Sequence, residues 1–390
     1  MRWVRGAAPL AIALAVAGAL VVGSADGSPE PCTLVASPSG SDVHAGTAGR
    51  PFRTAQKLVD SLRHGQAGCL MAGTYNLAGG PRGSQLEFAH GGSSGAPLTL
   101  KSYPGQVATL VGGPVYVPAG SNYVTITGLD INSRGAREPG VQIMGANVQL
   151  TNDDITNMNT PGSCIILGSD IGYGRAVNPL VAGDIVHQCG HNPRDPFEDH
   201  GVYVDNTTGA VITKNIFWGI PDGFGVQLYP DSQGSQVTHN VIDNNGSGVV
   251  IGGNSASTSS NNTVANNIIS ASARDYDIQG SWQRAVGTGN VAQGNCVFAG
   301  NQGNVESPPA GFSDIGNVTA DPAFVNEAAH STVGYELQTG SACLGVVGAD
   351  AAAAIATSRR ALGPAGVRSN SGGPTINGSP TAQPPSARAP

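Results

Sequence analysis

A short pattern of apolar and polar positions recurs through the middle of the chain. An Asn or Asp stands between an apolar residue three positions earlier and another two positions later, as in Val237-Thr-His-Asn240-Val-Ile242. The polar slot recurs in steps of 24 to 31 residues, at Leu129, Asp153, Asp184, Asn215, Asn240, Asn267 and Asn295. Repeats of this length predict a solenoid in which each copy packs on the next.

A second pattern lies out of phase with the first and is rich in β-branched residues. Its copies are Val141-Gln-Ile143, Ile165-Ile-Leu167, Val202-Tyr-Val204, Val226-Gln-Leu228 and Val249-Val-Ile251. Each repeat therefore contains at least two strands, separated by Gly, Asn and Asp turns without a helix. Strands that stack on their own copies predict an all-β fold, a right-handed parallel β-helix.

The polar slot has a structural role in such a fold. A buried Asn must satisfy both its carbonyl and its amide, and an equivalent Asn about 4.8 Å above and below can do so. The pattern thus predicts a buried asparagine ladder that includes Asn215, Asn240, Asn267 and Asn295. We expect these residues to support the fold and not to form a binding site.

One amphipathic segment precedes the repeats. Phe52, Ala55, Leu58, Val59 and Leu62 fall on one helical face, with Pro51 before them and Gly65 after them as start and stop signals. A short N-terminal capping helix is expected here, because the open end of a β-helix exposes unpaired strand edges.

Composition agrees with a turn-rich fold and excludes some partners. The chain has 390 residues, of which 57 are Gly and only 12% are charged. Basic residues number 19 against 26 acidic ones, a net charge of −7. No basic stripe is present to neutralise phosphates, so we expect no nucleic-acid partner.

The two ends of the chain differ from the middle. Arg2 and Arg5 precede an uncharged run that ends at Gly23-Ser-Ala25, which predicts a signal peptide over residues 1–25. The protein is then secreted, with no membrane attachment after cleavage and a monomeric β-helix domain over residues 26–350. Residues 351–390 predict a short helix and a disordered tail rich in Pro, Ser and Gly.

The chain contains six cysteines. In an exported protein this number favours three disulfides, although fifteen pairings exist. The pairing preferred here is local in sequence: Cys32 with Cys69, Cys164 with Cys189, and Cys296 with Cys343. A zinc site is the alternative, but the chain lacks CxxC spacing.

Two segments resemble a known family. The N-terminal one includes Gly73-Thr-Tyr75 and Leu98-Thr-Leu-Lys-Ser-Tyr103-Pro-Gly105, and the C-terminal one includes Asp321-Pro-Ala-Phe324. Over about residues 33–345 the chain resembles secreted pectate-lyase-like β-helix proteins, notably family 9 polysaccharide lyases and their relatives. The resemblance implies export and lyase-type β-elimination on a uronate-containing extracellular polysaccharide. Those lyases carry a catalytic Lys after an Asp-Gly-Phe-type turn, where this chain has Gln227.

The repeat is interrupted twice, by residues 168–179 and by residues 188–200. Extra residues in a solenoid must bulge as loops, and we expect both to bulge at one place and to carry function. The repeat register stacks Glu198 beside Asp222, and like charges one rung apart favour a bound cation. Glu198, Asp199 and Asp222 are therefore predicted to bind Ca²⁺.

The candidate catalytic residues follow from the same loops. Because a neutral amide cannot act as a base, the base must come from elsewhere than Gln227. The candidates named from the sequence are His200, Tyr203, Lys214, Arg194 and His191. The predicted substrate-binding residues are Gln227, Tyr173, Arg175 and Tyr229.

Other functions stay open at this point. The outward row Gln142, Ile166, Tyr203, Gln227, Val250 also suits a non-catalytic glycan-binding module or a surface protein. Asn152-Asp-Asp154 and Asp199-His-Gly201 weakly resemble galacturonan hydrolases, which use two carboxylates. Acidic turn residues and an exposed Lys214 are also ordinary solvated positions.

Overall fold

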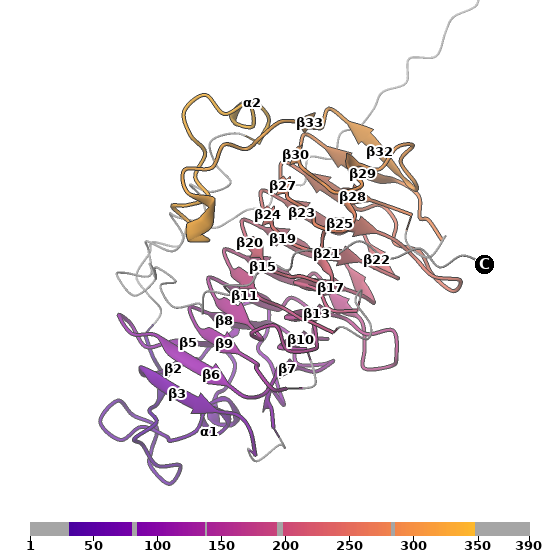
Figure 1. The fold of residues 1–390 in the computed structure, drawn as a ribbon. Helices are drawn as coiled ribbons and strands as arrows, with labels where there is room; N and C mark the ends of the chain where they lie inside the picture. Colours follow the sequence, from indigo (N-terminus) through magenta and orange to yellow (C-terminus); the bar gives the residue numbers. More distant parts are fainter. Residues whose placement is uncertain (1–30, 80–83, 137–138, 193–197, 282–284, 348–390) are drawn as a thin grey trace, which may run out of the picture. The chain divides into compact units, whose positions relative to one another are not determined.

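The fold is a right-handed parallel β-helix, seen in a computed structural model that describes residues 31–79, 84–136, 139–192, 198–281 and 285–347. Every element below lies in the unit that begins at Cys32. The predicted signal peptide, the tail over residues 351–390 and Arg194 lie outside the described residues. Figure 1 shows the strands stacked in parallel rows, coil upon coil.

Each coil contributes one strand to each of three long parallel sheets, and some coils add a strand to a small fourth sheet. Within the described residues the first sheet has 11 strands. They are β1 (Leu34–Ala36), β2 (Ala67–Leu70), β5 (Leu98–Ser102), β8 (Val124–Thr127), β11 (Gln149–Thr151), β15 (Leu180–Ala182), β19 (Val211–Thr213), β23 (Gln236–Thr238), β26 (Thr263–Ala265), β29 (Asn290–Gln293) and β32 (Phe312–Ile315).

The second sheet follows the first along each coil and has 10 strands in the described part of the chain. They are β3 (Gly73–Asn76), β6 (Ala108–Val111), β9 (Asp130–Asn132), β12 (Asp154–Thr156), β16 (Ile185–His187), β20 (Ile216–Trp218), β24 (Val241–Asp243), β27 (Ile268–Ser270), β30 (Cys296–Phe298) and β33 (Val318–Thr319).

The third sheet has nine strands among the residues described, and the small sheet has three. The third sheet comprises β4 (Leu86–Glu87), β7 (Val115–Val117), β10 (Val141–Ile143), β13 (Ile165–Leu167), β17 (Val202–Val204), β21 (Phe224–Leu228), β25 (Ser247–Ile251), β28 (Tyr276–Gln279) and β31 (Gly303–Val305). The small sheet comprises β14 (Ala176–Val177), β18 (Thr207–Thr208) and β22 (Ser232–Gln233).

The predicted asparagine ladder is confirmed at the corner between the first and second sheets. The side-chain oxygen of Asn267 accepts hydrogen bonds from the backbone and side-chain nitrogens of Asn240, both at 2.9 Å. The side-chain oxygen of Asn240 accepts the same two hydrogen bonds from Asn215. All the predicted asparagines are fully buried. The ladder extends one rung further than predicted, to Asn317, which accepts from Asn295.

The third sheet approaches the second so closely that β21 and β25 have glycine at their second position. A Cβ on Gly225 would lie 2.4 Å from a methyl carbon of Ile242, and one on Gly248 would lie 2.6 Å from a methyl carbon of Ile269. Real Cβ atoms do not approach other atoms this closely, because interiors are close-packed. Gly225 and Gly248 are therefore required by the packing of the two sheets.

The N-terminal end is closed by the predicted helix, α1 (Ala55–Ser61). Thr54 caps it by accepting a hydrogen bond from the backbone of Lys57. The apolar face named from the sequence is buried, with Leu58 fully so. The predicted capping role is thus confirmed.

The C-terminal end is a segment that packs on the outer face of the second sheet, beyond β33 (Figure 1). It contains the 3-10 helix η1 (Glu327–Ala329) and the short helix α2 (Leu344–Val347). Phe324 and Tyr335 of this segment contact Ile216, Val241 and Ile268 of the sheet. An apolar cluster therefore lies outside the coil, separate from the interior core.

All three predicted disulfides are present: Cys32–Cys69, Cys164–Cys189 and Cys296–Cys343. Each joins positions close in sequence, so each fastens neighbouring coils or a coil to its terminal segment. The bridge to Cys343 attaches the C-terminal segment to β30. Among the described residues, no helix has the length and apolar composition needed to cross a lipid bilayer.

Candidate functional site

The two long insertions flank the strands of the third sheet. Residues 168–179 follow β13, and residues 188–200 precede β17. The expectation that both would bulge at one place is therefore wrong, because one loop leaves the strand end of one coil and the other enters the strand start of the next. Strand β17, which the second loop enters, carries Tyr203 and is the sheet neighbour of β13, which the first loop leaves. The two loops therefore lie at opposite ends of adjoining strands.

The outer row of the third sheet has the predicted register. Tyr203 pairs with Ile166 on one side and with Gln227 on the other. The row is partly exposed at Tyr116, Gln142, Ile166 and Tyr203. It is closed beyond that point, because Gln227 is 3% exposed and Val250 is fully buried. Gln227, predicted to bind substrate, therefore does not face a ligand that lies on this row.

Tyr203 and Tyr229 are the aromatic residues at the closed end of the row. Their ring centroids are 6.5 Å apart, and the ring planes are inclined to each other by 21°. Burial raises the pKa of the Tyr203 hydroxyl, and the charges of Asp205 and Asp170 raise it further. Tyr203 therefore stays protonated and can donate a hydrogen bond, but it does not suit the role of a base.

His200 is buried beneath this surface and is 2% exposed. Its Nδ1 accepts a hydrogen bond from the backbone nitrogen of Phe224 at 3.1 Å, which places the proton on Nε2. Burial lowers the pKa of His200 to about 3. With Nδ1 occupied and Nε2 protonated, His200 orients the start of β21 and is not available as a general base.

A second histidine, His191, has the opposite arrangement. It is exposed, and its Nδ1 lies 2.7 Å from Oδ2 of Asp222, which is buried. Asp222 also accepts from the backbone of Asn192 and from the guanidinium of Arg274. A carboxylate can only accept hydrogen bonds, so Nδ1 of His191 carries the proton. Its Nε2 is then a proton acceptor on the side chain's exposed part.

Two of the three residues predicted to hold Ca²⁺, Asp199 and Asp222, already have partners within the protein. Oδ1 of Asp199 accepts from the backbone of Gly162 at 2.8 Å, and Asp222 is already balanced by Arg274. No group of three or more His, Cys, Asp or Glu side chains in the described residues is arranged to bind a metal. The cation that faces Asp222 in this structure is Arg274, which lies 52 residues after Asp222 in the chain.

A carboxyl pair that sequence reasoning missed lies at the other end of the same strand. Asp205 directly follows β17, and Oδ2 of Asp205 accepts from the backbone of Asp170 at 2.8 Å. Asp205 is 3% exposed, and its Oδ1 has no hydrogen-bond partner among the described residues. Burial, above all, raises the pKa of Asp205 to about 7, and the charge of Asp170 adds to this. The sequence signal that could have identified Asp205 is its position two residues after the outward-facing Tyr203.

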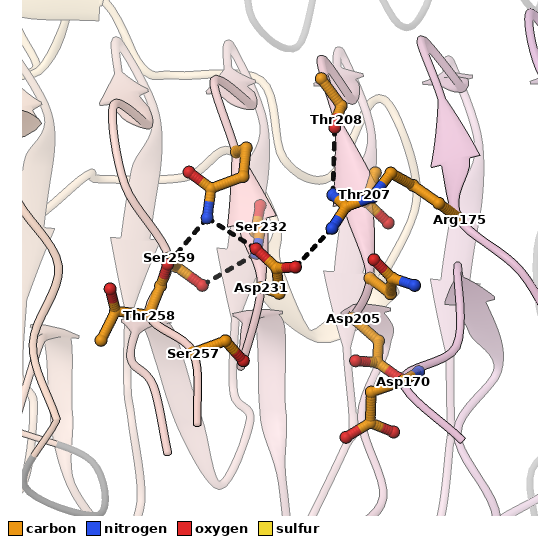
Figure 2. A network of polar contacts seen from close by, with 12 residues as sticks. Asp170, Arg175, Asp205, Thr207, Thr208, Asp231, Ser232, Ser257, Thr258 and Ser259 are labelled. Carbon is orange, nitrogen blue, oxygen red and sulfur yellow. Dashed lines mark hydrogen bonds and ion pairs between the residues drawn. The ribbon is translucent and has the colours of Figure 1, made fainter. Parts of the chain in front are cut away.

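The first insertion also holds an ion pair. Arg175, predicted to bind substrate, pairs with Asp231 and donates to the hydroxyl of Thr208 at 3.1 Å. Figure 2 shows this guanidinium bridging to Asp231 beside the small sheet, with Asp205 and Asp170 below it. Tyr173, also predicted to bind substrate, is 61% exposed at the tip of the same loop. The loop therefore exposes the ring of Tyr173, while Arg175 holds the end of the loop against Asp231 and Thr208.

Lys214 lies away from this surface. It occupies the corner before Asn215, between β19 and β20, with a φ of 59°. His239 and Asn266 occupy the same corner one and two coils later, with φ of 56° and 55°. Lys214 is thus an exposed turn residue beside the ladder, between the first and second sheets, whereas Tyr203 is on the third sheet. Asp153, of the hydrolase alternative, is a ladder residue that accepts from Leu129.

Comparisons with known proteins agree with this architecture. The model of the right-handed β-helix region matches residues 112–304. A solved pectate lyase, Pel9A, is similar over 80% of this chain and 91% of its own, with a TM-score of 0.59 and 13% identity. The uncharacterized protein YwoF of Bacillus subtilis (strain 168) is 25% identical over 138 residues, which span 31% of this chain and only 27% of that relative. With the parallel coils, the corner ladder and the terminal cap, these matches show that the chain folds as a right-handed β-helix, a fold that it shares with pectate lyase Pel9A.

Proposed function

We propose that this is a secreted carbohydrate-active protein that binds a uronate-containing polysaccharide along the outer row of the third sheet and cleaves it by β-elimination, with His191 as the base. The observation that carries the proposal is the bond from Nδ1 of exposed His191 to buried Asp222. It supplies a base in a chain that has Gln227 where the resembled lyases have lysine.

The pairing of His191 and Asp222 is suited to proton abstraction. A buried carboxylate fixes the tautomer of the imidazole and orients it, which is the logic of base activation in many enzymes. Arg274 and the backbone of Asn192 hold the carboxylate in turn. Within this set, the imidazole is the exposed group and Asp222 is the buried one.

The reaction breaks a carbon–hydrogen bond and a carbon–oxygen bond. Nε2 of His191 takes the proton from the carbon next to the uronate carboxylate, the electron pair forms a carbon–carbon double bond, and the glycosidic carbon–oxygen bond breaks. The departing oxygen takes a proton from solvent, and His191 returns its proton to solvent. The products are an unsaturated sugar and a new hydroxyl end. Tyr116, Tyr173 and Tyr203 border the row and can bind sugar rings by their faces.

Other observations support the substrate class and the compartment. The protein shares its fold with the pectate lyase Pel9A. Three disulfides and a leader-like first 25 residues are typical of an exported chain. Aromatic and amide side chains on a partly exposed sheet suit an extended glycan.

The test measures unsaturated product from pectate, alginate and glycosaminoglycan chains by ultraviolet absorbance, with and without a chelator. His191→Gln should lower the rate by about 100-fold or more, within the range of general-base contributions. His239→Asn is the matched control, because this histidine lies at a ladder corner where Asn266 stands one coil later. The control should retain the rate, and chelation should not change it. An active His191→Gln variant would refute the role of His191.

A non-catalytic glycan-binding module is the second candidate, favoured by Gln227 in the place of the lysine. It predicts that the wild-type protein binds one of these glycans and releases no product. New reducing ends without unsaturation would instead show a hydrolase. The same assay thus separates the three functions.

A further inference from the structure

Asp222 is a buried carboxylate that binds two exposed side chains. Nδ1 of His191 donates to its Oδ2, and the guanidinium of Arg274 donates to its Oδ1. The exposed fraction of the side chain is 3% for Asp222, 52% for His191 and 35% for Arg274. A ligand at this place therefore meets the imidazole and the guanidinium, and not the carboxylate.

Arg274 reaches Asp222 from another part of the β-helix. Strand pairing puts Asp222, Asn245 and Arg274 at equivalent positions of three successive coils, so the Arg274 side chain crosses the coil of Asn245. The backbone nitrogen of Arg274 donates to the carbonyl of Gly246 at 2.7 Å, and its carbonyl accepts from the side-chain amide of Asn301 at 3.1 Å. The backbone and the tip of this arginine are therefore both held, which lowers the entropy cost of binding a ligand.

The spacing of the two exposed side chains suits neighbouring atoms of one uronate ring. The carbon that loses its proton in β-elimination is bonded directly to the carboxylate carbon. His191 and Arg274 are likewise neighbours, because they bind the two oxygens of one carboxyl group. Both lie on the side where the strands of the third sheet begin, His191 before β17 and Arg274 before β28. One ring can therefore contact both side chains.

A guanidinium can bind two carboxylates at once. It carries five N–H donors in a planar fork, and a carboxylate accepts two parallel hydrogen bonds from such a fork. The bond of Arg274 to Asp222 is therefore compatible with a second carboxylate on the exposed part of the side chain. A methyl ester carries no negative charge and loses the charge-assisted part of this interaction.

We propose that Arg274 binds the carboxylate of the uronate ring that His191 deprotonates, an assignment that rests on the proposed function. As His191 takes the proton, negative charge moves onto this carboxylate, and the guanidinium stabilises that charge. Arg274 keeps its own protons, and the proton on His191 passes to solvent, so no other reactant is consumed. Arg274 therefore makes the protein specific for uronate rings whose carboxylate is not esterified.

The test compares the acid and methyl ester forms of polygalacturonate, alginate and unsulfated chondroitin. Arg274→Gln should lower kcat/KM on the acid form by about 100-fold, the size of one contact to a developing negative charge, and on the ester form by less than about threefold. Arg274→Lys keeps the charge beside Asp222 but loses the planar fork, so its loss on the acid form should be smaller. Arg53→Gln, at an exposed arginine before α1, is the matched control and should behave as the wild type.

Binding gives a second measurement that needs no turnover. His191→Gln should bind acid oligosaccharides from one of these polymers about tenfold more tightly than their methyl esters, and adding Arg274→Gln should remove the difference. Melting curves should show that the variants fold. An equal loss on acid and ester forms in Arg274→Gln, or an unchanged preference for the acid form, would overturn the assignment, because Arg274 would then only balance Asp222. No unsaturated product from the wild type would overturn the proposed function, whereas the binding preference would still support Arg274 as the carboxylate-binding residue.

Discussion

The outer faces of the second and third sheets are built from the same repeat but meet different surroundings. On the second sheet, Ile216, Val241 and Ile268 are fully buried beneath the C-terminal segment. On the third sheet, Tyr116 and Tyr203 stay partly exposed and are bordered by loops. The described chain after the last coil, up to Val347, covers the second sheet and not the third. The open face is therefore the surface available for a ligand, and charged groups gather at its borders.

The largest expected effect concerns the aromatic residue of each face. Trp218 on the covered face stacks between His187 and His330, at centroid distances of 4.7 Å and 4.1 Å. Trp218→Ala should lower the free energy of unfolding by about 3 to 5 kcal/mol, since a packed aromatic side chain is lost. Tyr203→Ala on the open face should cost less than about 2 kcal/mol but weaken glycan binding. Urea unfolding would measure both, and equal losses would contradict the comparison.

The next effect is a pH dependence that the covered face contributes. Burial raises the pKa of Asp243 to about 7, and Tyr335 of the C-terminal segment donates to this carboxyl at 3.1 Å. Because the folded-state pKa lies above the unfolded value, Asp243 contributes its full stability below about pH 4 and loses it as pH rises through 7. The contribution is about 2 to 4 kcal/mol.

Melting temperatures at pH 5 and pH 8 would test this. The wild type should melt lower at pH 8, and Asp243→Asn should reduce the difference. His200 acts with the opposite sign, because its lowered pKa contributes stability that is lost as pH falls below about 6.5. An undiminished pH slope in Asp243→Asn would mean that the C-terminal segment is not fastened by this carboxyl.

The ladder lies inside the coil, at the corner between the first and second sheets, so its contribution does not depend on which outer face is covered. Asn240→Ala removes the acceptor of Asn215 and the donor to Asn267, and should cost about 1 to 3 kcal/mol. His239→Asn at the adjacent corner should change the free energy of unfolding by less than about 0.5 kcal/mol. Chemical denaturation of the two variants gives the comparison. If both variants were equally stable, the ladder would not be a source of stability.

The smallest expected effect lies at the border of the open face. Tyr173→Ala removes a ring that is 61% exposed, so stability should not change. Glycan affinity should fall by about fivefold, the size of one aromatic contact. Val43→Ala, at another exposed apolar residue, is the control for both measurements. Unchanged affinity in Tyr173→Ala would place the glycan elsewhere on the molecule.

Sequence periodicity predicted the coil well because each coil repeats one local pattern. The ladder asparagines, the helix over Ala55–Ser61 and all three disulfides depend on spacing within or between adjacent coils. Asn317 escaped prediction because Asp314 stands where the pattern requires an apolar residue. The fold was therefore accessible wherever the repeat was regular.

The candidate site was less accessible because its contacts join turns of unequal length. Arg274 reaches Asp222 across 52 residues, and the backbone of Asp170 meets Asp205 across 35. The repeat register placed Tyr203 correctly on the outer row but could not show that Gln227 is covered or that His200 accepts from Phe224. Side-chain position in loops depends on the chain path, which periodicity does not specify.

The corner ladder also bears on how such a chain can change its length. Each asparagine makes the same bonds to the coil before it and the coil after it, so the corner is interchangeable along the row. Excising residues 241–267, the 27 residues between one corner and the next, would bring Asn240 against Asn295 with the bonding pattern intact. Duplicating the segment would lengthen the row by one coil. Insertions and deletions of whole coils are thus neutral at the corner, and the corner also accommodates coils of 24 to 31 residues, because extra residues bulge as loops between the strands.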